Sequence, residues 1–178
     1  LYHIGFGFEE VGSVTGEPCA GNPGKRLWRL PKSKSLVVYY GLKNMGAKLI
    51  SQRLSKLKFK MPIGINIAKT NCKETVELEK GIQDYVKAYK AFKYIGDYYT
   101  INISCPNAFG GQPFTDKIKL AKLLSAIDKE EKTKPIFLKL SPDLSNNMID
   151  DLIEVYEEAT ARGIIKGSSG SSGKSRKK

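Results

Sequence analysis

Short apolar segments alternate with amphipathic helical segments along most of the chain. The apolar segments begin about 36 residues apart and cover residues 62–68, 98–104 and 135–140. Apolar residues recur at helical spacing between Thr75 and Ile95, again from about Asp116, and again after Ser145, which is placed to cap a helix that Gly163 closes. Because consecutive parallel strands require a crossover, this alternation predicts an α/β fold, a parallel sheet or barrel covered by helices.

The same spacing predicts which side of each helix faces the sheet. We expect Val76 and Tyr85 on the buried side of the first helix, and Ile118 and Leu124 on the buried side of the second. Residues 164–165 are both isoleucine and have the character of the first residues of a further strand.

The first third of the chain departs from this repeat. Gly5–Thr15 predicts a strand that ends in a turn of small residues, and a loop rich in Gly and Pro follows it. Arg26–Leu30 predicts part of a β-hairpin arm, and a helix is expected around Ala47–Leu57. These segments are additional elements inserted in the connection between the first strand and the next.

The basic charge of the chain does not by itself indicate a nucleic-acid-binding protein. The formal net charge is +12, but the tail of residues 166–178 contributes five basic residues and no acids. Elsewhere, Lys and Arg are interspersed with Glu and Asp, without an RNA-binding or helix-turn-helix signature. The Gly/Ser-rich tail is typical of a disordered linker or tag, so we assign residues 1–165 to the folded unit and expect no nucleic-acid partner.

Cysteine and histidine usage limits the kinds of site that the chain can build. The three cysteines, Cys19, Cys72 and Cys105, are odd in number and widely spaced, and His3 is the single histidine. This pattern predicts neither a disulfide framework nor a metal site, and favours a reducing, cytoplasmic setting. No apolar run approaches the ~18 residues of a membrane span.

Polar residues occur inside the apolar segments at comparable places. Asn66 and Asn102 each stand between two isoleucines, and Lys139 stands between two leucines. All three are close to the carboxyl ends of predicted parallel strands, where α/β folds assemble ligand sites. A buried amide or ammonium without a partner costs roughly 1–3 kcal/mol or more, so the three residues predict a shared polar ligand or a mutual network. The simpler alternative is that each only bonds to a neighbouring loop.

Cys105 follows the second of these strands and stands between Asn102 and Asn107. A lone cysteine near a strand end is most often a small buried apolar residue. In a loop with Pro106 and two glycines, however, its thiol is placed to act as a nucleophile or a general base. The absence of a nearby histidine in sequence favours proton abstraction over cysteine-hydrolase chemistry.

Four ordered motifs resemble one family, dihydroorotate dehydrogenase. They are Phe6–Thr15, Gly64–Lys69, Asn102–Asn107 and Leu138–Asp143. The resemblance covers about residues 4–165 and implies a (β/α)8 TIM barrel, of which this chain supplies about half, roughly strands 2–5 with their helices. It further implies FMN as cofactor and the oxidation of dihydroorotate to orotate in pyrimidine (UMP) biosynthesis.

The resemblance also implies roles for individual residues. Cys105 matches the base that takes a proton from C5 of dihydroorotate while a hydride leaves C6 for N5 of FMN. The positions that match substrate-binding asparagines are Asn44, Asn102 and Asn107. The positions that match flavin-binding residues are Gly12, Ser13, Asn66, Asn102 and Lys139.

The electron acceptor differs between the classes that the chain resembles. Gly5–Thr15, the Arg26–Leu30 arm and Gly64–Lys69 resemble the quinone-reducing class, which is peripheral on the inner membrane and normally uses serine as its base. Cys105 and Gly110–Phe114 resemble the soluble classes, which use fumarate or an NAD-linked partner subunit. The acceptor therefore stays open. A cytoplasmic location is expected, or a peripheral one on the inner membrane if the acceptor is a quinone, and a homodimer is a separate expectation. The alternative function is a catalytically inactive half-barrel that acts only as a folding or association unit.

Overall fold

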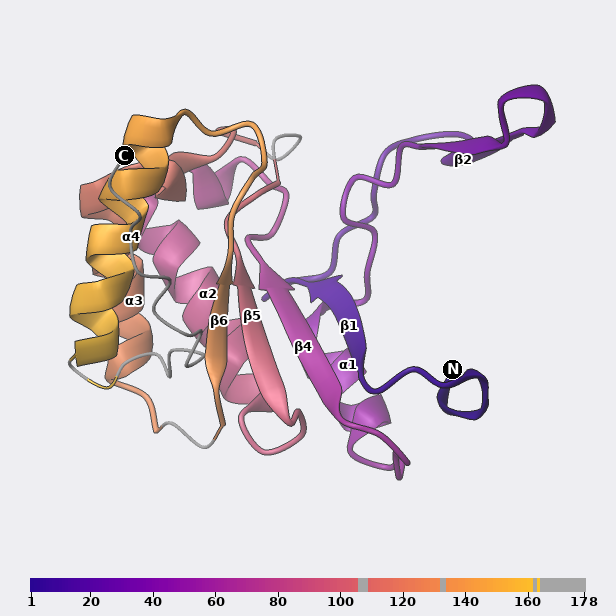
Figure 1. Cartoon of the computed structure of the whole chain (residues 1–178), viewed down its shortest axis with the longest axis horizontal. Helices are drawn as coiled ribbons and strands as arrows, with labels where there is room; N and C mark the ends of the chain where they lie inside the picture. The colour runs from indigo at the N-terminus through magenta and orange to yellow at the C-terminus, as the bar shows by residue number, and fades with distance from the viewer. Residues whose placement is uncertain (106–108, 132–133, 162, 164–178) are drawn as a thin grey trace, which may run out of the picture.

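A parallel four-stranded sheet forms the centre of the computed structural model, which describes residues 1–105, 109–131, 134–161 and 163. The strands lie in the order β1-β4-β5-β6 (Figure 1). Their bounds are Glu9–Val14 for β1, Ile63–Ala68 for β4, Tyr98–Asn102 for β5 and Ile136–Lys139 for β6. All three pairings in the sheet are parallel, as the alternation of strands and helices predicts.

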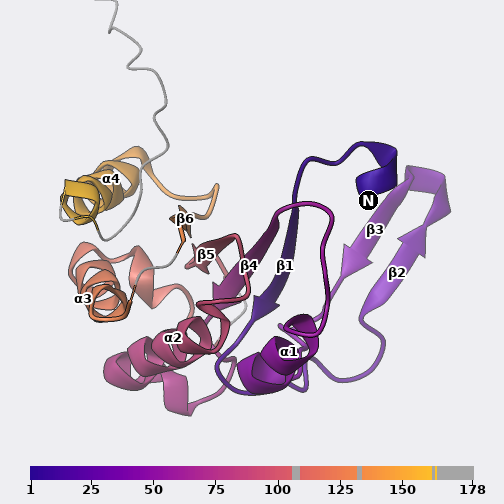
Figure 2. The same cartoon turned by 90° about the horizontal axis from the view of Figure 1, so that it is seen from below.

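The four α-helices of the described residues all lie on one side of this sheet, in an arc outside the strands (Figure 2). They are α1 (Gly46–Leu54), α2 (Leu78–Phe92), α3 (Lys117–Asp128) and α4 (Asn146–Ala161). Within the described part of the chain, no helix covers the opposite face. That open face corresponds to the interior of a barrel, where side chains of alternate residues point inward.

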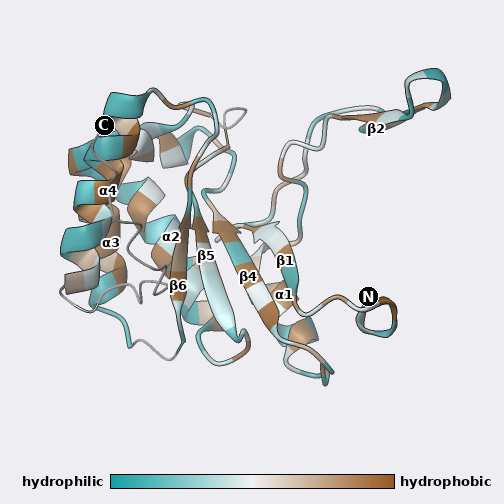
Figure 3. Cartoon of the chain, in the orientation of Figure 1, coloured by the Kyte–Doolittle hydropathy of each residue, from teal (hydrophilic) through white to brown (hydrophobic). Residues whose placement is uncertain are grey.

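The hydrophobic core lies between the sheet and the helices. Successive residues of a strand point to opposite faces, so Tyr99 and Ile101 of β5 point toward the helices and are fully buried. The ring of Tyr89 on α2 meets that of Tyr99 edge-on, with centroids 5.1 Å apart. Figure 3 shows the hydrophobic residues concentrated on β4 and β6 and on parts of the helices, with hydrophilic residues between them.

The helix caps follow the local sequence signals, but two of the predicted buried side chains are exposed. Asp116 caps α3 by accepting a hydrogen bond from the Lys119 amide at 2.9 Å, and Ser145 accepts one from the Met148 amide at 3.4 Å. The expected burial of Val76 and Ile118 is wrong, since they are 49% and 69% exposed.

Both errors have a simple geometric reason. Val76 ends the short 3-10 turn η3 (Glu74–Val76), and α2 begins only at Leu78. Ile118 and Leu124 are six residues apart, which separates them by about 120° around a helix; Leu120, Leu123, Leu124 and Ile127 form the buried side instead.

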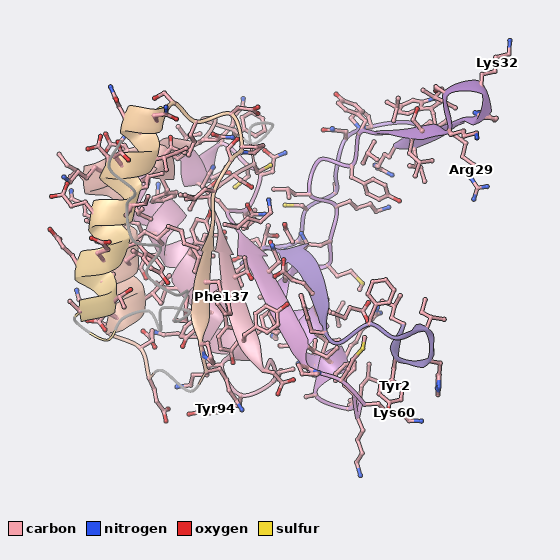
Figure 4. The ribbon with its side chains drawn as sticks, viewed as in Figure 1. Tyr2, Arg29, Lys32, Lys60, Tyr94 and Phe137 are labelled. Carbon is pink, nitrogen blue, oxygen red and sulfur yellow. The ribbon has the colours of Figure 1, made fainter. Side chains whose placement is uncertain are left out.

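A β-hairpin arm projects away from the sheet (Figure 1). β2 (Leu27–Leu30) and β3 (Ser35–Val38) pair antiparallel, which confirms the predicted hairpin. Pro31–Ser33 makes the turn between them, and Arg29 and Lys32 lie toward its tip (Figure 4). The remaining short elements are the 3-10 turns Tyr2–Ile4 and Pro113–Thr115.

Some expectations fall outside the described residues. These are the further strand at residues 164–165 and the disordered tail of residues 166–178. Among the described residues, none of the helices has the length and apolar character needed to cross a membrane.

Candidate functional site

The open face of the sheet is layered from the amino ends of the strands to their carboxyl ends. The first layer is aromatic: the Tyr98 ring packs edge-on against Phe8 and Phe137, with centroids 6.1 and 5.5 Å away. Figure 4 shows Phe137 on this open side of β6. A Cβ at Gly64 would lie 2.0 Å from the Tyr98 ring, so the glycine makes room for it.

The second layer is built around the carboxylate of Glu10 on β1. Oε1 of Glu10 accepts a hydrogen bond from Nδ2 of Asn66 on β4 at 2.7 Å. Oε2 accepts one from Oγ1 of Thr100 on β5 at 2.6 Å. Because Nδ2 of Asn66 is turned toward Glu10, its Oδ1 is turned toward the next layer.

The third layer lies at the carboxyl ends of β1, β4 and β5. Oδ1 of Asn66 accepts hydrogen bonds from Oγ of Ser13 at 2.8 Å and from Nδ2 of Asn102 at 3.1 Å. Nδ2 of Asn102 also donates to Oγ of Ser13 at 3.1 Å. The register of β1 shifts between Val11 and Val14, which brings Ser13 into this layer.

Gly12 lies in this register shift and leaves no space for a side chain. Its φ of +121° favours glycine, and a Cβ would lie 2.6 Å from the backbone oxygen of Asn66. The close approach of the β1 and β4 backbones therefore depends on a glycine at this position.

Lys139 extends the network to β6. It pairs with Asn102 in the register of β5 and β6, and its Nζ donates to Oγ of Ser104 at 2.7 Å. Oγ of Ser104 in turn donates to Oδ1 of Asn102 at 2.7 Å. The hydrogen bonds therefore run without a break from Glu10 through the polar side chains of all four strands to Lys139.

An open cavity of about 750 Å³ lies against this face. Glu10, Thr100 and Lys139 contribute polar atoms to it, and Tyr98 and Phe137 contribute aromatic rings. A site that combines flat apolar surface with a few fixed donors and acceptors suits a planar, polar-edged ligand.

Cys105 follows this edge of the sheet and is half-buried. It lines a small crevice with Asn102, Lys69, Tyr85 and Gln112. Tyr85 on α2 donates to the backbone oxygen of Asn102 at 2.7 Å, which ties the end of β5 to the helix layer. The structure thus places Cys105 next to Asn102, while Asn107 lies outside the described residues.

Lys69 is a functional candidate that sequence reasoning missed. It follows β4 directly and is only 4% exposed. Nζ donates to Oγ1 of Thr75 at 3.1 Å and to the backbone oxygen of Phe109 at 2.8 Å. Burial lowers the pKa of the Lys69 ammonium, and the negative charges of Cys72, Asp84 and Cys105 partly oppose that shift. A lysine immediately after a fully buried strand was the available signal.

Asp84 supports the same region from α2 and was also missed. Its carboxylate accepts hydrogen bonds from the amide of Thr70 at 2.7 Å and from Oγ1 of Thr70 at 2.6 Å. Burial raises the pKa of Asp84, and these hydrogen bonds act in the opposite direction. The sequence signal was an acid within the apolar stripe of a helix, next to Tyr85 and one turn from Ala88.

Asn44 lies apart from the Asn66–Asn102 network. It lines a cavity of about 360 Å³ together with Gly12 and Ser13. Nδ2 of Asn44 donates to Oγ1 of Thr15 at 2.9 Å and to the backbone oxygen of Leu42 at 2.7 Å, and Oδ1 accepts from the Gly46 amide at 2.8 Å. The structure therefore brings Asn44 near Gly12 and Ser13 but engages its amide in the turn before α1.

Among residues 1–105, 109–131, 134–161 and 163, no three His, Cys, Asp or Glu side chains gather in a way that could hold a metal ion.

Comparison with known proteins points to one family. The family model for dihydroorotate dehydrogenase matches residues 1–177. A dihydroorotate dehydrogenase (quinone) of Mycolicibacterium smegmatis is 37% identical over 162 residues, which are 91% of this chain and 45% of the relative. One of Nostoc sp. is 38% identical over 167 residues, covering 91% of this chain and 43% of the relative. The chain thus spans less than half the length of these relatives.

Solved structures agree on the fold. The crystal structure of DHODH in complex with ferulenol from Eimeria tenella has a TM-score of 0.73 at 25% identity, covering 88% of this chain and 48% of that one. The ligand-free enzyme from the same organism has a TM-score of 0.74 at 24% identity. The prediction that this chain forms about half of an α/β barrel of this type is confirmed.

Proposed function

Because the chain belongs to the dihydroorotate dehydrogenase family, we propose that the complete protein oxidises dihydroorotate to orotate with FMN in pyrimidine biosynthesis. The observation that supports this most directly is the continuous polar network on the open face. It joins Ser13, Asn66, Asn102, Ser104 and Lys139 at one edge of the sheet, next to the thiol of Cys105.

The donor set at this edge fits a flavin. The flavin ring has carbonyl and N–H groups along one side, and FMN when bound supplies the acceptor for a hydride. Gly12 is exposed and Ser13 half-buried on β1, the amides of Asn66 and Asn102 offer donors and acceptors, and Lys139 offers a positive charge. These five residues would hold the ring.

Cys105 would act on the substrate proton. Its thiolate takes the proton from C5 of dihydroorotate, which lets the C5–C6 double bond form as a hydride leaves C6. Cys105 lines one crevice together with Asn102 and Gln112, and this proximity to a proposed substrate-binding amide supports the role.

Asparagines would orient the substrate ring. The proposed contacts are Asn102, Asn107 and Asn44, because a neutral amide matches a ring edged with carbonyl and N–H groups without adding charge. For Asn44 this requires its amide to exchange at least one of its present bonds to Thr15 and Leu42 for a bond to substrate.

The electron acceptor that we propose is a quinone, since the curated relatives carry quinone in their names. A quinone dissolved in lipid requires the protein to meet a membrane surface, so we propose peripheral association. Fumarate and an NAD-linked partner subunit are the competing acceptors, and a cysteine at position 105 is the feature that favours them.

The test uses the complete protein, purified with its bound cofactor. Extraction should release FMN, and anaerobic addition of dihydroorotate should bleach the flavin absorbance. Parallel assays with a water-soluble quinone, fumarate and NAD⁺ identify the acceptor, and we expect the quinone to give the fastest turnover. A colourless protein, or one whose flavin is not reduced by dihydroorotate, would contradict the proposal. Residues 1–165 alone should bind little FMN, because they form only about half of the barrel and carry only some of the residues that would hold the flavin.

A further inference from the structure

Two side chains from the loop after β4 hold the backbone of a single residue in the loop after β5. Nζ of Lys69 donates to the carbonyl oxygen of Phe109 at 2.8 Å. The amide of Phe109 donates to Oδ1 of Asn71 at 2.8 Å. Both polar groups of one peptide residue are thus satisfied by partners about 40 positions earlier in the chain.

The loop that supplies these side chains is itself fixed. Lys69 is tied to Thr75, whose Oγ1 donates to the backbone oxygen of Thr70 at 2.6 Å. Thr70 is held by Asp84 of α2 through both its amide and its hydroxyl. Lys69 and Asn71 therefore project from a base that is anchored to the helix layer.

The segment that they hold carries Cys105. Phe109 is four residues after Cys105. On the far side, Nε2 of Gln112 donates to the backbone oxygen of Ser104 at 3.0 Å, which joins the two ends of the segment. A Cβ at Gly110, whose φ is +78°, would lie 3.4 Å from the side chain of Val76, so this part of the segment runs close to η3. The described parts of this segment are thus tied down on both sides of Cys105.

A buried lysine is an unfavourable choice for stability alone. Removing an ammonium from water is unfavourable before its new partners are counted, and an apolar side chain of similar length would fill the same space. A lysine at this position is expected where its charge and donors serve another purpose.

We propose that Lys69 and Asn71 are positioning residues, which clamp the backbone of Phe109 and so set the position of the Cys105 thiol against the substrate. The catalytic part of this inference rests on the proposed function of Cys105. The clamp itself does not, because it concerns the backbone of Phe109.

The first experiment compares Asn71→Ala with Asn71→Asp in the complete, flavin-loaded protein. Hydrogen exchange of the Phe109 amide and steady-state kinetics are measured on the same samples. Asn71→Ala should speed exchange at Phe109 by about 10-fold or more and lower kcat by roughly 10–100-fold, with a smaller change in KM. Asn71→Asp keeps an oxygen acceptor and should restore protection and most of kcat. Asn147→Ala, on the exposed first turn of α4, is the matched control and should change neither.

The second experiment removes the ammonium with Lys69→Met. We expect kcat to fall by a similar factor while the bound-flavin spectrum is retained and the melting temperature stays the same or rises. A purely structural lysine would instead lower the melting temperature without changing kcat in the folded fraction, and this result would overturn the proposal.

The outcomes separate the clamp from the proposed reaction. Unchanged exchange at Phe109 in Asn71→Ala overturns the clamp, whether or not the protein oxidises dihydroorotate. Faster exchange with unchanged kcat overturns the positioning role. A complete protein that never oxidises dihydroorotate overturns the proposed function and the catalytic part of this inference, while the exchange data still decide the clamp.

Discussion

The carboxyl edge of the sheet and the hairpin arm use apolar strand residues in opposite ways. Every residue of β4 is buried, and the polar side chain within it, Asn66, is hydrogen-bonded to two neighbouring strands. Every residue of β3 is exposed, including Leu36 at 58% and Val38 at 60%. Apolar strand residues therefore form part of a buried site in β4 and part of an exposed surface in β3.

The difference shows where each region obtains its stability. The sheet is stabilised by helices on one face and by side-chain hydrogen bonds on the other. A two-stranded hairpin alone is marginally stable in water, and among the described residues the arm is an antiparallel pair that stands clear of the helix layer. Substitutions in the two regions should accordingly differ in kind, with effects on chemistry and folding at the sheet and small effects on the arm.

The largest expected effect is the loss of activity in Cys105→Ala. Without the thiol, proton abstraction should slow by about 10²–10⁴-fold, while bound FMN gives the same absorbance spectrum. Turnover of dihydroorotate in the complete protein measures this. Lys32→Ala at the arm provides the comparison and should retain turnover within about twofold.

Cys105→Ser sharpens the same test. A serine hydroxyl ionises at far higher pH than a thiol with its reference pKa of about 8.5, so the rising limb of the rate against pH should move to higher pH. If Cys105→Ala turns over as fast as the wild type, the thiol is not the base. The same follows if the pH profiles of Cys105→Ser and the wild type coincide.

The second effect is on folding and compares one tyrosine from each region. Tyr89 on α2 is fully buried against Tyr99, whereas Tyr39 after β3 is 53% exposed. Tyr89→Ala should lower the free energy of unfolding by about 3–5 kcal/mol, because it leaves a large cavity in the core. Tyr39→Ala should change it by about 0.5 kcal/mol or less. Denaturant unfolding of the complete protein measures both, and equal losses would show that the arm is packed against something in solution.

Much of the fold could be predicted from the sequence because its signals are local. The strand-helix period, the cap at Ser145 and the hairpin at Arg26–Leu30 each depend on residues that are near one another in sequence. The placement of Asn66, Asn102 and Lys139 at one edge also follows, since parallel strands bring their carboxyl ends together.

The partners of the site could not be predicted, because they are set by tertiary packing. Glu10 orients Asn66 across 56 positions, and Lys69 reaches Phe109 across 40. No local pattern specifies which carboxylate or lysine will be turned toward a neighbouring strand or loop. Asn44 illustrates the reverse case, in which the motif indicates a ligand but the observed amide is bonded to its own turn.

The smallest expected effect is a pH dependence of stability that arises from Asp84. Burial raises the pKa of this carboxyl above its ordinary value of 3.8, so between that value and the raised one the folded state binds more protons than the unfolded state. Stability contributed by Asp84 is therefore fully present below about pH 3.8 and falls as pH rises through the raised pKa. Asn at position 84 does not ionise, so in Asp84→Asn this fall in stability should vanish. The wild type should therefore lose stability relative to the variant as pH rises. A further difference, which does not depend on pH, is expected from the altered hydrogen bonds to Thr70. Denaturant unfolding at several acidic pH values measures the difference, with Asp150→Asn on the exposed side of α4 as the control. A difference that is independent of pH would show that Asp84 ionises like a solvent-exposed carboxyl and that its contribution is limited to holding the loop after β4.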